Sequence, residues 1–231
     1  MNDLLVLLML LDLHVHSCYS EDSVSQPVDL VKRAAEKGIG FAVTDHDNCN
    51  GWGDFRKLAK DYGVPLVFGV ELKVFRGKKM LGEILGLFLK KPVVETDFLE
   101  AVSQIHGQGG LVVTPHPFDL ARKPFLRGWD ELEKQKRHVD AIEVFNSRTV
   151  VKKFDARAKK FAKDHGLPMV CGSDAHTVNE LGNSLTEVRA KTLEEARGEI
   201  LAGNTRLHCR KSSFLVHSYS TMAKLGLKKA R

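Results

Sequence analysis

The sequence lacks several features that would point to particular classes of protein. Its four cysteines are widely scattered and form no Cys-x-x-Cys pair, which argues against a disulfide framework or a zinc knuckle and favours a reducing cytoplasm. It has no apolar run of the roughly 20 residues that a membrane span requires, so we expect no membrane association. It also has no internal repeat and no low-complexity linker, and one domain is the simplest expectation.

The N-terminal segment is rich in leucine and superficially resembles the hydrophobic part of a signal peptide. It lacks the basic residues that precede such a segment and the small residues of a cleavage site. It also continues directly into Asp12-Leu-His14. We therefore predict that this segment leads into a buried first strand.

Excess charge of one sign is missing from most of the chain. The net charge is +6, from 35 Lys and Arg against 29 Asp and Glu, but seven of the basic residues lie between Arg206 and Arg231, where there is no acidic residue. The remainder of the chain is almost neutral. The basic C-terminal tail is compatible with binding of nucleic acid and equally with simple solvation.

Short β-branched runs alternate with helical stretches along the whole chain. The predicted strands are Val6–His16, Gly40–Thr44, Pro65–Phe75, Met80–Leu89, Leu111–Pro115, Ala141–Phe145, Pro168–Cys171 and Thr205–Cys209. The predicted helices are Pro27–Lys37, Asp54–Tyr62, Thr96–Gly107, Val150–His165 and Leu193–Leu201. This alternation favours a parallel sheet with helical crossovers, and seven or eight such units can close into a barrel.

Side chains that bind metals recur at the ends of the predicted strands. Five of the ten histidines and several carboxylates occupy such positions: His14, His16, Asp22, His46, Glu71, His116, Asp174 and His176. Strand residues two apart project to the same side, so His14 and His16 can approach one ion together. Because the C-terminal ends of parallel strands meet at one rim, the sequence predicts a shared metal site there.

The mixture of imidazole and carboxylate groups restricts the metals that we expect. These donors suit Zn²⁺, Mn²⁺ or Fe²⁺ and do not suit a site made of thiolates or of oxygen atoms alone. Carboxylates also reduce the repulsion between neighbouring cations, so a cluster of two or three ions is feasible.

The same residues closely resemble the four motifs of the PHP (polymerase and histidinol phosphatase) family of metal-dependent phosphoesterases. The motifs occur in order, and the resemblance runs from about Leu11 to about Leu201. They are Asp12-Leu-His-Val-His16-Ser, Val43-Thr-Asp-His46-Asp, Pro115-His116-Pro117 and Gly172-Ser-Asp174-Ala-His176. The resemblance implies a single-domain distorted (β/α)7 TIM-like barrel over residues 1–205, followed in residues 206–231 by the last strand and the basic tail.

The resemblance also implies an arrangement of ligands for a di- or trinuclear centre. One ion would be held by His14, His16, Glu71 and Asp174, and a second by Asp22, His46 and His176. Glu71 would bridge to a third ion bound by His116. Family members usually supply a further histidine to this third ion, whereas Glu83 occupies that position here and shifts the preference toward harder ions.

Other residues take supporting roles in this interpretation. We expect Asp174, His176 and Glu71 to be the ligands most directly involved in catalysis. Asp12 and Asp45 are expected behind the ligands, with Asp45 fixing an imidazole tautomer. Glu143 is expected either behind the ligands or facing substrate. Arg148 is a candidate for substrate binding, as are Arg122 and Lys123, for which solvation is an equal alternative.

The predicted reaction is hydrolysis of a phosphomonoester, such as a nucleotide or another small phosphorylated metabolite, by hydroxide formed at the metal centre. The short spacing between Glu83 and His116 leaves no room for a large inserted cap, which leaves the substrate open. Two alternatives remain. One is an exonuclease acting on oligonucleotide ends, and the other is an RNA-associated barrel subunit resembling the ribonuclease P protein component, for which the complete ligand set would have no purpose.

Overall fold

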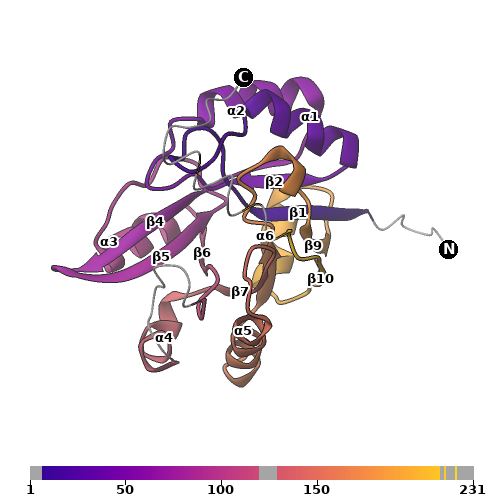
Figure 1. Ribbon diagram of the computed structural model, residues 1–231. Helices are drawn as coiled ribbons and strands as arrows, with labels where there is room; N and C mark the ends of the chain where they lie inside the picture. Colours follow the sequence, from indigo (N-terminus) through magenta and orange to yellow (C-terminus); the bar gives the residue numbers. More distant parts are fainter. Residues whose placement is uncertain (1–6, 120–128, 214–215, 217–221, 223–231) are drawn as a thin grey trace.

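The computed structural model of the protein describes residues 7–119, 129–213, 216 and 222 (Figure 1). Its strands are β1 (Leu8–Val15), β2 (Gly40–Val43), β3 (Leu66–Phe68), β4 (Val70–Arg76), β5 (Lys79–Leu87), β6 (Leu111–Thr114), β7 (Ala141–Asn146), β8 (Met169–Gly172), β9 (Ser184–Arg189) and β10 (Arg206–Cys209). Its α-helices are α1 (Pro27–Lys37), α2 (Trp52–Tyr62), α3 (Phe98–His106), α4 (Trp129–Gln135), α5 (Lys152–Asp164) and α6 (Leu193–Leu201), with short 3-10 turns at Lys136–His138 and Val178–Glu180.

The strands form two five-stranded sheets in a mixed α/β fold. One sheet has the order β10-β9-β1-β2-β3 and the other β4-β5-β6-β7-β8. The pairs β1–β2, β2–β3, β6–β7 and β7–β8 are parallel, as the alternation of strands and helices predicts. Helices α1 and α2 cover one side of the molecule, and α5 lies at the opposite end (Figure 1).

The two sheets meet close to the predicted metal ligands. Isolated bridges join His46 to Glu71 and Val15 to Ala175, so the ends of β2 and β4 are adjacent, as are the ends of β1 and β8. One of the two apolar cores is built from both sheets together. Its buried residues include Leu11, Leu13, Ala42, Val67, Leu85, Leu87, Val113, Ala141, Val170 and Val188. The strands thus enclose a common interior.

Local sequence signals account for several helix ends. Helix α1 begins at Pro27, whose fixed backbone angle suits the first turn, and Gly38 ends it in the left-handed conformation at φ 62°. The side chain of Asp97 accepts hydrogen bonds from the first backbone N–H groups of α3. Thr192 caps α6 in the same way.

Two parts of the sheet topology differ from the prediction. The predicted strand Pro65–Phe75 is divided at Gly69 into β3 and β4, and β4, β5 and β6 are antiparallel neighbours rather than members of a parallel series. Strand β9 was not predicted at all. It runs antiparallel to both β1 and β10 and carries the last strand back against the first sheet.

Some predictions fall on parts of the chain outside the described residues. They concern Arg122 and Lys123 as substrate-binding residues, and the greater part of the basic tail beyond Ser213. Within the described ranges, none of the helices has both the length and the apolar character that a bilayer crossing requires. All four cysteines are free thiols.

Candidate metal centre

The structure brings the first predicted ligand set together at the junction of the two sheets. His14 and His16 lie near the end of β1, Glu71 lies on β4 and Asp174 follows β8. Glu71 Oε2 is 3.4 Å from His14 Nε2 and 3.3 Å from His16 Nε2. Asp174 Oδ1 is 3.7 Å and 3.4 Å from the same two nitrogens. All four side chains are buried.

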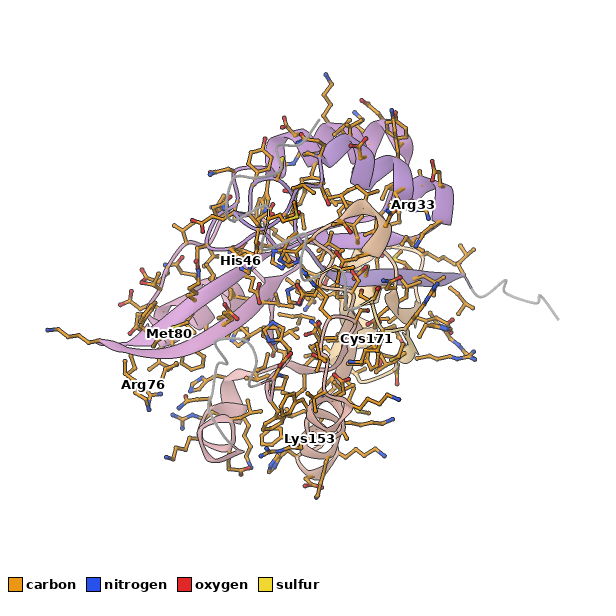
Figure 2. All side chains as sticks on the ribbon, in the orientation of Figure 1. Arg33, His46, Arg76, Met80, Lys153 and Cys171 are labelled. Atoms are coloured by element: carbon orange, nitrogen blue, oxygen red, sulfur yellow. The ribbon has the colours of Figure 1, made fainter. Side chains whose placement is uncertain are left out.

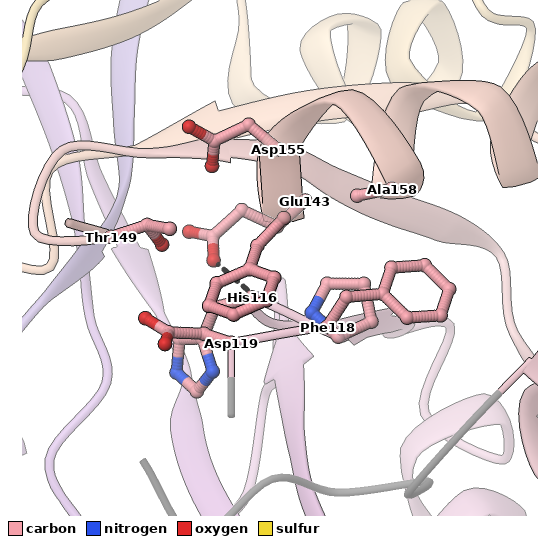
Figure 3. A pocket seen from close by; sticks show the side chains of 9 residues that line it. His116, Phe118, Asp119, Glu143, Thr149, Asp155 and Ala158 are labelled. Atoms are coloured by element: carbon pink, nitrogen blue, oxygen red, sulfur yellow. Dashed lines mark hydrogen bonds between the residues drawn. The ribbon is translucent and has the colours of Figure 1, made fainter. Parts of the chain in front are cut away.

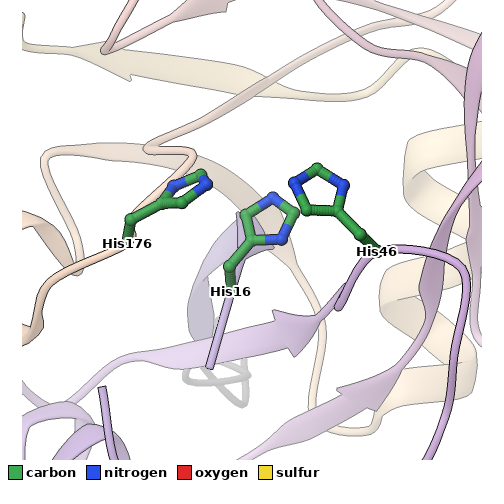
Figure 4. Close-up of side chains that lie close together, drawn as sticks. All are labelled: His16, His46 and His176. Carbon is green, nitrogen blue, oxygen red and sulfur yellow. The ribbon is translucent and has the colours of Figure 1, made fainter. Parts of the chain in front are cut away.

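The second predicted set converges beside the first. Asp22 Oδ1 lies 3.5 Å from His46 Nε2 and 3.2 Å from His176 Nε2. The imidazole rings of His16, His46 and His176 face one another, with His16 at the centre (Figure 4). The His16 ring centroid is 4.3 Å from that of His46 and 4.4 Å from that of His176. The two sets therefore form one continuous cluster.

The third set is centred on the other side of Glu71. Its Oε1 atom lies 3.4 Å from His116 Nε2, while its Oε2 atom lies 3.0 Å from His46 Nδ1. Glu83 on β5 contributes a carboxylate oxygen to a group with His46 and Glu71 whose candidate ligand atoms all lie within 4.8 Å of one another. Glu83 is thus close enough to take the position usually held by histidine, and its role as a ligand stays a prediction.

Hydrogen bonds behind the rings fix the tautomers of two histidines on β1 and just after it. His14 Nδ1 lies 3.1 Å from Glu143 Oε1, and because an ionised carboxylate only accepts, this nitrogen carries the proton. Ser20 Oγ donates to Asp45 Oδ1 and is 3.3 Å from His16 Nδ1, so it accepts from that ring nitrogen. The Nε2 atoms of both rings face the cluster, and in the neutral form of each ring Nε2 is the nitrogen without a proton.

His176 is oriented by a different acceptor with the same result. Its Nδ1 atom donates to the backbone carbonyl of Asp174 across 2.8 Å, which leaves Nε2 directed at Asp22. A neutral imidazole whose outer nitrogen is held by an acceptor is the usual form of a metal-binding histidine. Three of the predicted ligands are therefore prepared for a cation in the same way.

The nitrogen and oxygen atoms that face the cluster are arranged as ligands of a cation rather than as hydrogen-bond partners of one another. The Nε2 atoms of His14 and His16 face each other across 3.1 Å, so two neutral rings with outward-facing Nδ1–H groups would place two lone pairs in opposition. Glu71 Oε1 is buried and accepts no hydrogen bond of ordinary geometry. A buried carboxylate oxygen without a donor is costly unless a positive charge compensates it. Divalent cations would satisfy both features.

Burial and mutual charge shift the pKa values of the cluster strongly. Burial opposes ionisation of Glu71, but the imidazoles of His14 and His46 outweigh it and hold the pKa of this carboxyl well below its usual range. Burial lowers the pKa of His14, but the carboxylates of Asp174, Glu71 and Glu143 outweigh burial, and the net pKa lies well above the usual value, so a bound cation would replace a proton on Nε2. For His16, burial and the neighbouring His46 and His176 lower the pKa to about 3, so this ring stays neutral.

The backbone is strained at two of the predicted ligands. His116 has φ 28° and Asp174 has φ 55°, both in the left-handed region that non-glycine residues rarely adopt. Such conformations cost about 1–3 kcal/mol and persist where the surrounding contacts enforce them. At Asp174 the amide of Asn146 supplies such a contact, because Nδ2 donates to Asp174 Oδ2 across 3.2 Å and leaves Oδ1 facing the imidazoles.

The two aspartates expected behind the ligands contact groups around the ligands rather than the imidazole rings. Asp12 accepts hydrogen bonds from the backbone N–H groups of Ser173 and Gly182, and burial raises its pKa to about 6. It therefore anchors the loop that carries Asp174 and His176. Asp45 bonds to the hydroxyls of Ser17 and Ser20 rather than directly to an imidazole, and its influence reaches His16 through Ser20.

The two residues considered for substrate binding are also engaged with the protein. Glu143 Oε2 accepts from the His116 backbone N–H (Figure 3) and from Asn146 Nδ2. Its Oε1 faces His14 Nδ1, so both oxygens are engaged and the structure favours a position behind His14. Arg148 is buried, with Nε 3.4 Å from Glu180 Oε1. Its guanidinium is held inside the protein, and its role in binding substrate stays a prediction.

Sequence reasoning missed Ser20, Asn146 and Glu180 as parts of the centre. Glu180 accepts hydrogen bonds from the backbone N–H groups of His176 and Thr177 through Oε2. Asn146 offered one signal, since it ends a strand next to the rim. Ser20 and Glu180 offered none, because their partners are distant in sequence or are backbone groups.

The comparisons with known proteins agree with this architecture. The PHP domain model matches residues 12–120, and the model of the PHP-associated region matches residues 155–205. The chain belongs to the PHP family. An uncharacterized protein of Methanocaldococcus jannaschii, MJ0417, is 33% identical over 191 residues, which cover 81% of this chain and 73% of that protein.

Two further similarities concern the fold alone or a short part of the chain. A two-domain protein from Bacteroides vulgatus that contains a predicted PHP-like metal-dependent phosphoesterase has a TM-score of 0.73 and 21% identity, covering 88% of this chain and 65% of that chain. At this identity the likeness shows the fold. A 5′-3′ exoribonuclease of Haemophilus influenzae is 42% identical over 62 residues, which are 26% of this chain and 22% of that protein.

Proposed function

We propose that the protein is a metal-dependent phosphoesterase that hydrolyses a phosphomonoester, either a nucleotide or another small phosphorylated metabolite. The observation that carries the proposal is the proximity of the nine predicted ligands in one largely buried cluster, in which acceptors behind His14, His16 and His176 hold their Nδ1 atoms. Membership of the PHP family supports the same reaction. A module that only binds RNA has no need of such a cluster, so the enzyme is favoured over the ribonuclease P type of subunit.

We further propose two or three ions of manganese, zinc or iron, held by the ligand sets predicted from the sequence. When bound, these cations supply a water molecule of lowered pKa and neutralise charge on the phosphoryl oxygens. The role of the protein is to hold the donors in place. Glu143, Ser20 and the Asp174 carbonyl hold the Nδ1 side of three imidazoles and direct Nε2 toward the cluster, and Glu71 joins the ligand sets.

The common interior lined by both sheets also supports a distorted (β/α)7 barrel as the finer description of the fold. The bridges at His46–Glu71 and Val15–Ala175 lie where such a barrel would close. In this arrangement the cluster occupies the rim at the C-terminal ends of the parallel strands, as is typical of barrel enzymes.

The test is a screen of phosphorylated metabolites with the purified protein after separate loading with Mn²⁺, Zn²⁺ or Fe²⁺, with elemental analysis of each preparation. Glu71→Gln should lower turnover by more than about 100-fold and reduce the bound metal, because a ligand matters more than the partners behind it. Glu36→Gln on α1 removes the same charge at an exposed position and should change neither. Full activity of Glu71→Gln, or no phosphate release by the wild-type protein with any metal, would contradict the proposal.

A further inference from the structure

Strand β4 carries a lysine beside the candidate centre that the predicted ligand sets do not use. Lys73 lies two residues after Glu71, so both side chains project from the same face of the strand. In the antiparallel pairing of β4 with β5, Lys73 lies directly opposite Glu83. Side chains that are opposite each other in such a pair are about 5 Å apart at Cβ. The ammonium group of Lys73 is therefore within reach of the position predicted for the third ion.

Asp47 fixes the position of the Lys73 side chain. Its Oδ2 atom accepts from Lys73 Nζ across 2.6 Å, and its Oδ1 atom accepts from the Lys73 backbone N–H across 2.7 Å. Asp47 directly follows His46, and its own backbone N–H donates to the Glu71 carbonyl. An ammonium group has three N–H donors, so the contact with Asp47 leaves Lys73 able to donate to a further oxygen.

The charge of Lys73 is stabilised by the carboxylates around it. Burial opposes this charge, but Asp47, Glu83 and Glu71 outweigh burial and raise the pKa of the ammonium group. A positive charge that belongs to the chain thus lies beside Glu83. A divalent ion held by Glu83 would be next to this ammonium group, and like charges so close repel in a partly buried site.

Lys73 also lies on the accessible side of the centre. Its side chain is 42% exposed and that of His46 is 24% exposed, whereas the side chains of His14 and His16 are fully buried. Figure 2 shows His46 at the inner end of the β4–β5 hairpin and Arg76 at its outer end. A phosphoryl group that reaches the cluster past His46 therefore meets the ammonium group of Lys73.

From these contacts we infer that Lys73 supplies the third positive charge of the candidate centre, so that the protein holds two ions and the Lys73 ammonium group binds the phosphoryl group of the substrate. A lysine is a compact point charge and suits the oxygens of a phosphoryl group. Glu83 then has Lys73 rather than a third ion as its cationic partner. The inference rests on the proposed function for the reaction at this site.

The test compares Lys73→Met with Lys78→Met in the full chain. Both variants remove one ammonium group from the same hairpin, but Lys78 lies in the exposed turn between Arg76 and Met80, away from His46 (Figure 2). Bound manganese is counted by elemental analysis after equilibration with excess Mn²⁺ and removal of unbound metal. Binding of inorganic phosphate is measured by isothermal titration calorimetry at two and at four equivalents of Mn²⁺.

The wild type and Lys78→Met should each hold two Mn²⁺ ions per chain and bind phosphate equally. At two equivalents, Lys73→Met should bind phosphate roughly 10- to 100-fold more weakly, as expected for loss of a hydrogen bond from a charged group. With excess Mn²⁺, a third ion should enter Lys73→Met beside Asp47 and Glu83. Part of the phosphate affinity should then return in this variant alone.

Three ions in the wild-type chain, or equal phosphate Kd values for Lys73→Met and Lys78→Met, would overturn the inference. A loss of affinity that excess Mn²⁺ does not reverse would also overturn it, because Lys73 would then bind phosphate without replacing an ion. The two proposals fail separately, since ion counts and phosphate binding need no turnover. A wild-type chain that hydrolyses p-nitrophenyl phosphate with three ions bound would keep the proposed function and lose this inference.

Discussion

Three of the five imidazoles of the candidate centre are each oriented by a different kind of acceptor. A carboxylate holds His14, a serine hydroxyl holds His16 and a backbone carbonyl holds His176. The outcome is the same at all three residues, because each acceptor fixes the proton on Nδ1 and leaves Nε2 for the cluster. At the scale of single residues, the chemistry of the site therefore depends on the groups behind the rings as much as on the rings.

Glu143→Gln tests this dependence. The amide keeps the size of the side chain but weakens the acceptor that faces His14 Nδ1, so the affinity for Mn²⁺ should fall about 10- to 100-fold. Isothermal titration calorimetry of the metal-free protein measures this directly. If Glu143 faced substrate instead, the variant would bind Mn²⁺ like the wild type and would change only the KM of the phosphoester.

Arg148→Met tests whether the buried arginine positions the loop of His176. Loss of the guanidinium leaves the Glu180 carboxylate buried without its cationic partner, and breaking a buried pair in this way costs about 3–5 kcal/mol. At about 2–4 °C per kcal/mol, the Tm should fall by roughly 6–20 °C in a calorimetric scan. Arg148→Met combined with Glu180→Gln should recover part of the loss, since the charge left behind is then gone. An unchanged Tm with a raised KM would restore the substrate-binding role.

The candidate ligands could be predicted from the sequence because their residue types recur at strand ends. The residues that hydrogen-bond to these ligands could not be predicted from the sequence. Glu180 acts on backbone N–H groups of His176 and Thr177, and Ser20 acts through one hydroxyl shared among Asp45, His16 and the His46 backbone N–H. Arg148 follows a strand end like several of the candidate ligands, and its contact with Glu180 could not be predicted from that position.

At the scale of elements, the close approach of β8 to β1 brings Asp174 to His14. The strand ends at Gly172, and a Cβ atom added there would lie 2.5 Å from His14 Cβ and 2.9 Å from Glu143 Oε1. These distances leave no room for a side chain. Glycine is therefore required by the contact between the two strands, and the geometry of the ligands follows from it.

Gly172→Ala should separate β8 from β1 and weaken the cluster. Overpacking of a buried contact typically costs about 1–3 kcal/mol, and the shift also displaces His14 and Glu143 from each other. Chemical denaturation with Mn²⁺ titration measures both effects. Gly198→Ala in α6 is the matched control, because nothing lies within 4 Å of its added Cβ and alanine favours a helix by about 0.5–1 kcal/mol. Equal stability of the two variants would contradict the account of Gly172.

Most elements could be predicted from periodicity and end signals, and α1 agrees with its predicted bounds because Pro27 and Gly38 mark both ends. The sheet topology could not be predicted in full. In the run Pro65–Phe75, Glu71 and Lys73 alternate with apolar residues as they would in one continuous strand, so its division at Gly69 depends on Gly69 lying against the β5 backbone at Gly86. Strand β9 was missed because its sequence is polar, although its residues alternate between buried and more exposed positions. Its partner β1 also begins more than 170 residues earlier.

At the scale of the whole molecule, the candidate ligands divide between the two sheets. His14 and His16 belong to the first sheet, and Glu71 and Glu83 to the second. A cation bound between them would join the sheets at the point where their ends meet. The buried carboxylates would also lose their mutual repulsion, so binding of metal and stability of the fold should be linked.

Mn²⁺ should therefore raise the thermal stability of the chain, and EDTA should lower it. At a free concentration 100 times the Kd, one site adds about 2.7 kcal/mol to the folded state, which corresponds to a Tm increase of roughly 5–10 °C for a chain of this size. Differential scanning calorimetry across a Mn²⁺ series measures the effect. Glu71→Gln removes the residue that contacts both sheets' histidines, so its Tm should respond far less, whereas Glu36→Gln should respond as the wild type does. A Tm that ignores Mn²⁺ in the wild-type chain, or that rises equally in Glu71→Gln, would show that the cluster does not tie the sheets together through a cation.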